Sequence, residues 1–265
     1  MQTVEDFQLN IRNMRKVLGQ APRAFGAVRF DSNNDCNVHC AYCHNARSDD
    51  LIDLRDFQSF LEQSVLSVDE FQFGCAMEPT LDDRLCDFME VLGRTGVRPK
   101  SRFRLQTNGI LLHRHDPARM VAAGLTHLAV SVDSAEADTH KDLRGGTSLA
   151  KVERNLRNFH RDCPRVHILF LTTVTSANID ALPTLVSWGI ALGVEQFVFR
   201  QMFHYEHSPV VDHERMRALT VSGDAFAEAR ARIQGNFGGS ARLIFIENST
   251  LVERASRVRV DSGIA

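Results

Sequence analysis

Residues 26–45 read GAVRFDSNNDCNVHCAYCHN, and this stretch sets the class of fold that the remaining residues must build. Its first seven residues have the apolar content and short length of a buried β-strand. Directly after them stand Cys36, Cys40 and Cys43, with the spacing C-x3-C-x2-C. Three thiols on one loop at the carboxyl end of a strand can hold a single metal centre and leave a fourth coordination position for another ligand.

Short strands of this kind recur along the chain, and each is followed by a segment with helical spacing. Strands spaced about 25 to 45 residues apart and joined by helices predict a parallel sheet with right-handed crossovers. We therefore expect an α/β fold, a partial (β/α)6 TIM-like barrel that binds ligands at the carboxyl ends of its strands. A doubly wound open sheet would give the same pattern. The predicted strands begin near Gly26, Glu70, Ser101, Thr126, Arg165 and Glu195.

The predicted helices cover residues 53–66, 81–92, 117–123, 148–160 and 179–192. Gly93, Gly124 and Gly193 follow three of them, where a left-handed C-cap residue is expected.

Three segments are expected along the chain. Residues 1–24 are predicted to form a lead-in helix, and residues 25–200 the partial barrel. Residues 201–265 leave the strand–helix repeat and predict a C-terminal extension that covers the open side of the barrel. This extension contains one helix near 212–233 and one strand at 243–246.

Composition excludes several classes of partner. The 31 basic and 33 acidic side chains give a net charge of −2, so no basic field indicates nucleic acid. No apolar run approaches the roughly 20 residues of a membrane span, and acidic and basic residues interrupt the N-terminus before any signal-peptide core. We expect a cytoplasmic protein, whose oligomeric state the sequence does not indicate.

The cysteine loop, defined as residues 35–45, has two candidate metals. Zinc would need a fourth protein ligand, which His39 or His44 could supply, but zinc motifs usually come as two separated cysteine pairs. A 4Fe–4S cluster held by three cysteines fits the spacing better, because its fourth iron can take an external ligand.

At these residues the chain resembles the radical S-adenosylmethionine (radical SAM) superfamily, over roughly residues 25–200. The superfamily carries an aromatic residue just before its third cysteine, and Tyr42 stands there. The resemblance implies one 4Fe–4S cluster bound by Cys36, Cys40 and Cys43, with the amino and carboxylate groups of SAM on the remaining iron. The Tyr42 backbone would meet the adenine.

The ends of later strands add to the resemblance. Residues 76–79, AMEP, are similar to the GGEP stretch that holds the SAM amino group, although Ala76 and Met77 replace its glycines. Residues 107–109 resemble a TNG turn, and Ser131 with Asp133 would meet the ribose. The full set of SAM contacts implied in this way is Tyr42, Glu78, Asn108, Ser131, Asp133, Arg144, Thr173 and Arg200.

The resemblance implies reductive cleavage of SAM to methionine and a 5′-deoxyadenosyl radical, which removes a hydrogen atom from a small-molecule substrate. A sugar, nucleoside or natural-product precursor would suit this chemistry, with flavodoxin or ferredoxin as electron donor. Two alternatives stay open: an activating enzyme that places a glycyl radical on a partner protein, and a zinc- or cluster-stabilised binding module.

The remaining cysteines are Cys75, Cys86 and Cys163, and none lies in residues 201–265. We therefore expect no auxiliary cluster. Cys75 stands beside the predicted SAM pocket, where its thiol could return a hydrogen atom to a substrate radical, and the alternative is a small packing residue. Residues 203–213 are rich in histidine and are predicted to form a solvated loop in which substrate contacts are to be sought.

Overall fold

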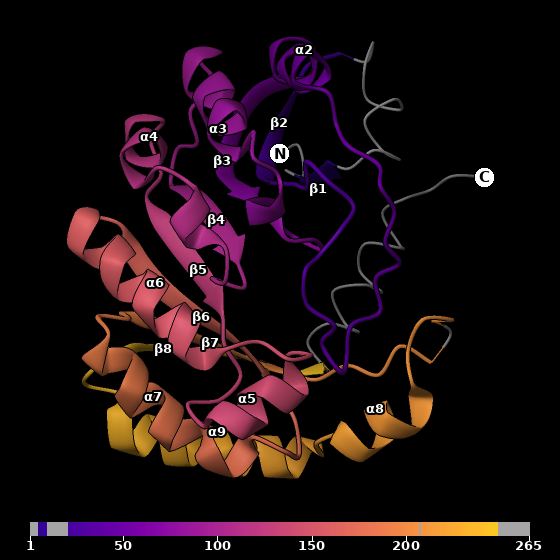
Figure 1. Ribbon diagram of the computed structural model, residues 1–265, viewed down its shortest axis with the longest axis vertical. Coiled ribbons are helices and arrows are strands. Elements are labelled where there is room, and N and C mark those ends of the chain that lie inside the picture. Colours follow the sequence, from indigo (N-terminus) through magenta and orange to yellow (C-terminus); the bar gives the residue numbers. More distant parts are fainter. Residues whose placement is uncertain (1–4, 10–20, 207, 249–265) are drawn as a thin grey trace. The chain divides into compact units, whose positions relative to one another are not determined.

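The computed structural model describes residues 5–9, 21–206 and 208–248 (Figure 1). The chain divides into two compact units. The first comprises Met1–Val38, Asn45–Ser131 and Ala150–Ile168. The second comprises His39–His44, Val132–Leu149 and Leu169–Ala265. The cysteine loop is therefore shared, since Cys36 belongs to the first unit and the other two cysteines belong to the second.

Parallel strands form the sheet of the first unit, and each pairs with the strand that precedes it along the chain. These strands are β1 (Glu5–Leu9), β2 (Arg23–Phe30), β3 (Val65–Phe73), β4 (Arg102–Thr107) and β5 (His127–Ser131). On β4 the buried Phe103 and Leu105 alternate with half-buried polar residues. This period of two turns one face of the sheet toward the core.

Helices cover that apolar face, and Figure 1 shows three of them in succession along one side of the strands. The helices of this unit are α2 (Leu54–Ser64), η1 (Pro79–Leu81), α3 (Leu85–Arg94), η2 (Leu112–Arg114), α4 (Pro117–Ala122) and α6 (Leu149–Asp162). The rings of Phe30 and Phe57 lie 4.3 Å apart, and those of Phe30 and Phe88 lie 5.2 Å apart. Burial of each such side chain contributes about 2–3 kcal/mol, so this aromatic cluster holds α2 and α3 on the sheet.

The second unit repeats the arrangement with three parallel strands, β6 (His167–Val174), β7 (Gln196–Gln201) and β8 (Arg242–Ile246). Its helices are α5 (Ala137–Leu143), η3 (Ile179–Ala181), α7 (Leu182–Ala191), α8 (His213–Leu219) and α9 (Gly223–Phe237). Helices α7 and α9 pack against each other, as Figure 1 shows.

Within each unit the strand order follows the order along the chain, from β1 to β5 in the first and from β6 to β8 in the second. This confirms the predicted α/β partial TIM-like barrel, and the six predicted strands correspond to β2 through β7. No helix within the described ranges is both long and apolar enough to cross a lipid bilayer.

The predicted lead-in helix is wrong over Glu5–Leu9, which form β1. Residues 10–20 lie outside those that the structure describes. Strand β1 pairs in parallel with β2, and Leu9 is fully buried. Parallel pairing with an existing strand therefore decides the conformation of a segment whose own pattern, EDFQL, is mixed.

Two helix ends also differ from the prediction. Helix α2 ends at Ser64, and Val65 begins β3, because the backbone of residue 65 turns to an extended conformation. Gly93 lies inside α3 and is not a left-handed cap, whereas Gly124 and Gly193 do adopt positive φ, at 105° and 83°.

In the C-terminal extension, the single predicted helix is two helices, α8 and α9. Ser222 caps the second by accepting a hydrogen bond from the Ala225 N–H at 3.2 Å. The predicted strand at 243–246 is confirmed as β8. Helix α5 was not predicted, because its seven polar-rich residues, ADTHKDL, carry too little apolar periodicity.

Candidate functional site: the cysteine loop and the strand ends

The second and third cysteines lie in one tight turn of the second unit. The Cys43 N–H donates a hydrogen bond to the Cys40 carbonyl at 3.0 Å. Both thiols are half-buried and free. Burial raises the pKa of the Cys40 thiol, and the guanidinium of Arg144 opposes that shift. The turn thus brings two free thiols together on one loop, and their role as cluster ligands stays a prediction.

The first cysteine lies in the first unit, where Arg47 fixes the backbone around it. The Arg47 guanidinium donates to the carbonyls of Cys36 and Val38. The Cys36 N–H donates to the Asp35 carboxylate at 2.7 Å. With its backbone held on both sides, Cys36 is a half-buried cysteine that forms no disulfide, like the other two.

Glu78 is buried after β3 and binds the end of β4. Its carboxylate accepts hydrogen bonds from the Thr107 hydroxyl at 2.6 Å and from the Asn108 N–H at 2.7 Å. It also accepts from both the N–H and the hydroxyl of Thr80. Burial raises the pKa of Glu78, and these hydrogen bonds oppose the shift. The carboxylate therefore joins two strand ends, and its predicted contact with the SAM amino group stays a prediction.

Asp31 organises the segment before Glu78. Its carboxylate, 5% exposed, accepts hydrogen bonds from the N–H groups of Cys75, Ala76 and Met77 at 2.8–3.3 Å. These consecutive donors form a turn in place of the flexible glycines of the related motif. Cys75 is half-buried in this turn, so its role as hydrogen donor stays a prediction.

Asp133 is the fully buried centre of a second cluster. It pairs with Arg144, with Nε and Oδ2 2.7 Å apart, and accepts from the Thr173 N–H at 2.9 Å. The Tyr42 hydroxyl also donates to it. Desolvation raises the pKa of this phenol well above its ordinary value, so Tyr42 stays protonated as a donor. Four of the predicted SAM-contact residues are thus brought together in the second unit.

The remaining predicted residues lie elsewhere. The Asn108 amide donates to the Asn37 side chain at 2.7 Å, which ties the predicted TNG turn to the start of the cysteine loop. Ser131 is half-buried at the end of β5, and Arg200 is exposed near the end of β7. Their contacts with SAM stay predictions.

Sequence reasoning missed Asp31, Arg47 and Asn178. The Asn178 amide donates to the Asp133 carbonyl at 2.8 Å and so fixes the main chain of that residue. Each of the three acts on backbone groups, and the partners of Asp31, like the Asp133 carbonyl that Asn178 binds, lie 44 to 46 residues away along the chain. A single sequence carries no local signal for such pairs.

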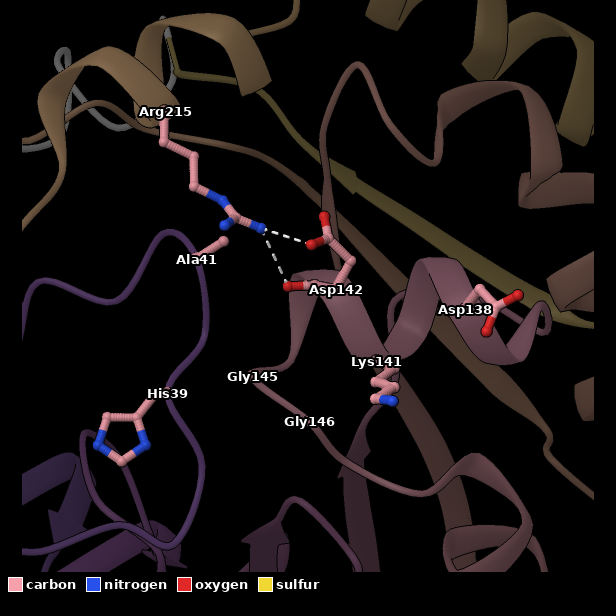
Figure 2. Close-up of a pocket in the computed structure, with 8 residues that line it drawn as sticks. All are labelled: His39, Ala41, Asp138, Lys141, Asp142, Gly145, Gly146 and Arg215. Atoms are coloured by element: carbon pink, nitrogen blue, oxygen red, sulfur yellow. Dashed lines mark hydrogen bonds and ion pairs between the residues drawn. The ribbon is translucent and has the colours of Figure 1, made fainter.

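A pocket of about 380 Å³ opens in the second unit (Figure 2). Arg215 reaches from α8 to the Asp142 carboxylate at 2.8 Å. Positive and negative side chains balance in the lining, so the pocket does not select a strongly charged ligand. It is lined by His39, Ala41, Asp138, Lys141, Asp142, Gly145, Gly146 and Arg215.

The loop after β7, predicted to be solvated, packs on the cysteine loop within the second unit. The rings of His44 and Tyr205 stack with centroids 3.5 Å apart. His204 and His213 share a hydrogen bond of 3.1 Å between their ring nitrogens. Tyr205 is 39% exposed, so the loop remains open to solvent while it covers His44.

Comparison with known protein families matches residues 32–188 to the Radical SAM superfamily. The match spans more than half of the 265 residues. The chain belongs to the radical SAM superfamily. Members of this superfamily are enzymes that work with an iron–sulfur cluster and SAM, so the alternative of a zinc-stabilised binding module is set aside.

Among curated proteins, this radical SAM chain is similar to a probable GTP 3′,8-cyclase from Methanocaldococcus jannaschii. The two are 24% identical over 226 residues, which cover 79% of this chain and 73% of that protein. An AdoMet-dependent heme synthase from Methanosarcina barkeri is 27% identical over 129 residues, covering 47% of this chain and 35% of that protein.

Solved radical SAM structures share the fold. SuiB from Streptococcus suis bound to S-adenosylmethionine has a TM-score of 0.65 at 13% identity, covering 89% of this chain and 53% of that one. The enzyme anSMEcpe bound to AdoMet and a peptide has a TM-score of 0.61 at 18% identity, covering 84% and 63%. The chain therefore spans little more than half the length of these structures.

The residues present fit an iron–sulfur cluster by the chemistry of their donor set. Thiolate sulfur is the ligand that such clusters take, and three half-buried cysteines that form no disulfide stand on one loop. Within the ranges described, no group of three His, Cys, Asp or Glu side chains is gathered into a metal-holding set.

Proposed function

We propose that this chain binds one 4Fe–4S cluster through Cys36, Cys40 and Cys43 and uses SAM to act on a small-molecule substrate. When bound, the reduced cluster supplies one electron that cleaves SAM to methionine and a 5′-deoxyadenosyl radical, which removes a hydrogen atom from the substrate. The turn that joins Cys40 to Cys43, with both thiols reduced, is the observation that carries the proposal.

The chain's own residues bind and orient SAM in this proposal. Asp133 holds Tyr42 and Arg144, two of the predicted SAM contacts, in place, and Glu78 keeps the end of β3 beside the Thr107–Gly109 turn. Both carboxylates are buried, so they hold these groups in place before the cofactor arrives. Such preorganisation lowers the entropic cost of fixing SAM.

The small-molecule substrate is supported by sequence similarity. Several of the similar curated proteins are named GTP 3′,8-cyclases, and one of them is covered over 73% of its length. The peptide complexes among the solved structures come at 14–18% identity, where likeness extends to the fold alone. A nucleotide or another compact metabolite is therefore the favoured substrate class, with flavodoxin or ferredoxin as the expected electron source.

A stimulation assay tests the proposal. The protein is purified and reconstituted without oxygen, reduced with dithionite and supplied with SAM, and 5′-deoxyadenosine is quantified with a nucleotide panel, a metabolite panel or a peptide library. We expect stimulation and a new product with a small molecule. Stimulation by a protein or peptide alone would instead favour the alternative of an activating enzyme.

The thiol of Cys75 is tested in the same assay. If it returns a hydrogen atom to the substrate radical, Cys75→Ala keeps formation of 5′-deoxyadenosine and loses product. Unchanged product formation would assign Cys75 to packing. Cys163→Ser is a suitable control, because this buried cysteine lies away from the strand ends and its sulfur donates only to the Pro117 carbonyl at 3.6 Å.

A further inference from the structure

The last residue of α5, Leu143, and the two residues after it lie against the cysteine loop. The Ala41 N–H donates to the Leu143 carbonyl at 2.9 Å. A Cβ atom added to Gly145 would stand 2.3 Å from the His39 carbonyl oxygen, so the two backbones touch at that point. Between these contacts, Arg144 faces Cys40, and its Nη1 donates to the Cys40 Sγ at 3.8 Å.

The Arg144 guanidinium is anchored on its other edge. Its Nε lies 2.7 Å from Oδ2 of Asp133, and its Nη2 donates to Oδ1 at 3.3 Å. The Arg144 side chain is 10% exposed, and that of Asp133 is fully buried. Asp133 is fixed in turn by the Tyr42 hydroxyl and the Thr173 N–H. The ion pair with Asp133 thus fixes the Nε and Nη2 edge of the planar guanidinium, and Nη1 is left to donate to the Cys40 sulfur.

We propose that Arg144 is a positioning residue for the cluster, which holds the Cys40 sulfur in place and raises the reduction potential of the cluster. This inference rests on the proposed function, because it requires Cys40 to be a cluster ligand. Hydrogen bonds to ligating sulfur and nearby charge are two of the protein's means of setting such a potential. Reduction adds one negative charge to the cluster, and a fixed N–H donor and a cation beside one ligand stabilise that charge.

The ion pair with Asp133 gives the inference its sharpest test, because the charges of Arg144 and Asp133 shift the reduction potential of the cluster in opposite directions. Loss of the guanidinium removes a donor and a positive charge near Cys40. Loss of the Asp133 charge leaves the positive charge of Arg144 uncompensated. An effect that came only from general loosening of the loop would shift the potential in the same direction in both variants.

The experiment is a redox titration of the reconstituted cluster with dithionite, followed by electron paramagnetic resonance, with iron and sulfide content measured in parallel. For Arg144→Gln we expect the ratio of reduced to oxidised cluster at a fixed potential to fall about tenfold, or ~59 mV for a one-electron couple. Asp133→Asn should shift the potential upward. Arg161→Gln, at an exposed position on α6, is the matched control and should leave it unchanged.

Arg144→Lys keeps the result decisive if Arg144→Gln fails to fold. Lysine retains the charge beside Asp133, but a single ammonium cannot donate along both directions of the fork, so we expect a smaller downward shift. Arg144→Gln or Arg144→Lys protein with full iron and sulfide and an unchanged potential would overturn the inference. Wild-type protein without a cluster would overturn the proposed function itself, whereas a wild-type cluster with unshifted variants leaves that function standing.

Discussion

The Asn108 N–H donates a hydrogen bond of 2.7 Å to the buried carboxylate of Glu78, and this contact joins the ends of β3 and β4. The same carboxylate accepts from Thr107 and twice from Thr80. The carboxyl ends of adjacent parallel strands are where folds of this kind bind ligands, and here one side chain maintains the spacing of two such strand ends.

Glu78→Gln should destabilise the protein. The amide replaces one accepting oxygen by an NH2 group that faces N–H and O–H donors, so buried hydrogen bonds are lost. We expect a fall of about 2–4 kcal/mol in the free energy of unfolding, measured by urea denaturation. A fall below about 0.5 kcal/mol would contradict the role of Glu78 in joining the two turns.

Gly145→Ala should damage the cysteine loop, whereas Gly146→Ala should be tolerated better. Both glycines have positive φ, at 61° and 91°, so alanine is strained at either position. Only at Gly145 would the new Cβ also collide with the His39 backbone, at 2.3 Å, while nothing lies within 4 Å of Gly146. The cost of the left-handed conformation is about 1–2 kcal/mol and is common to both variants.

Thermal denaturation and iron content of the two glycine variants separate the cost of backbone strain, which both share, from the cost of the collision with His39. We expect Gly145→Ala to be the less stable and to retain less iron. Equal losses in the two variants would show that the backbone at Gly145, just after α5, does not press on the cysteine loop.

His140 should make the protein acid-sensitive. Burial, helped by the charge of Arg144, lowers the pKa of this histidine from 6.5 to about 4. Between these values the unfolded chain binds a proton that the folded chain does not, so stability is full above pH 6.5 and falls as the pH drops toward 4. The loss amounts to about 2–3 kcal/mol.

Chemical denaturation at a series of pH values checks this, with His140→Leu as the comparison. In the variant, the free energy of unfolding should no longer show the part of its pH dependence between pH 4 and 6.5 that His140 contributes. Identical slopes in the variant and the wild type would show that His140 does not titrate in this way.

Local periodicity predicts most of the fold. Strands β2 to β7 combine apolar, β-rich sequences with turn residues, and the helices between them have amphipathic faces. Strand β1 could not be predicted in this way, because the mixed sequence EDFQL forms a strand only by pairing with β2. Helix α5 could not be predicted either, because it is short and polar. Its last turn nevertheless contacts the cysteine loop.

The residues of the candidate site likewise include some that the sequence could predict and some that it could not. The cysteines, Tyr42 and Asp133 could be predicted because each stands in a short motif at a strand end. Asp31 and Arg47 could not, because their partners are backbone groups of distant or irregular segments. Nor does the sequence show that Arg144 faces Cys40, since 104 residues separate them.

The most direct test of the central claim is cleavage of SAM by oxygen-free protein in which the three loop cysteines are replaced together by serine. The wild type should bind about four iron and four sulfide ions per chain and form 5′-deoxyadenosine from SAM and dithionite. The triple variant should bind neither and form none, while Cys163→Ser behaves as the wild type. A triple variant that keeps iron, sulfide and 5′-deoxyadenosine formation would contradict the account.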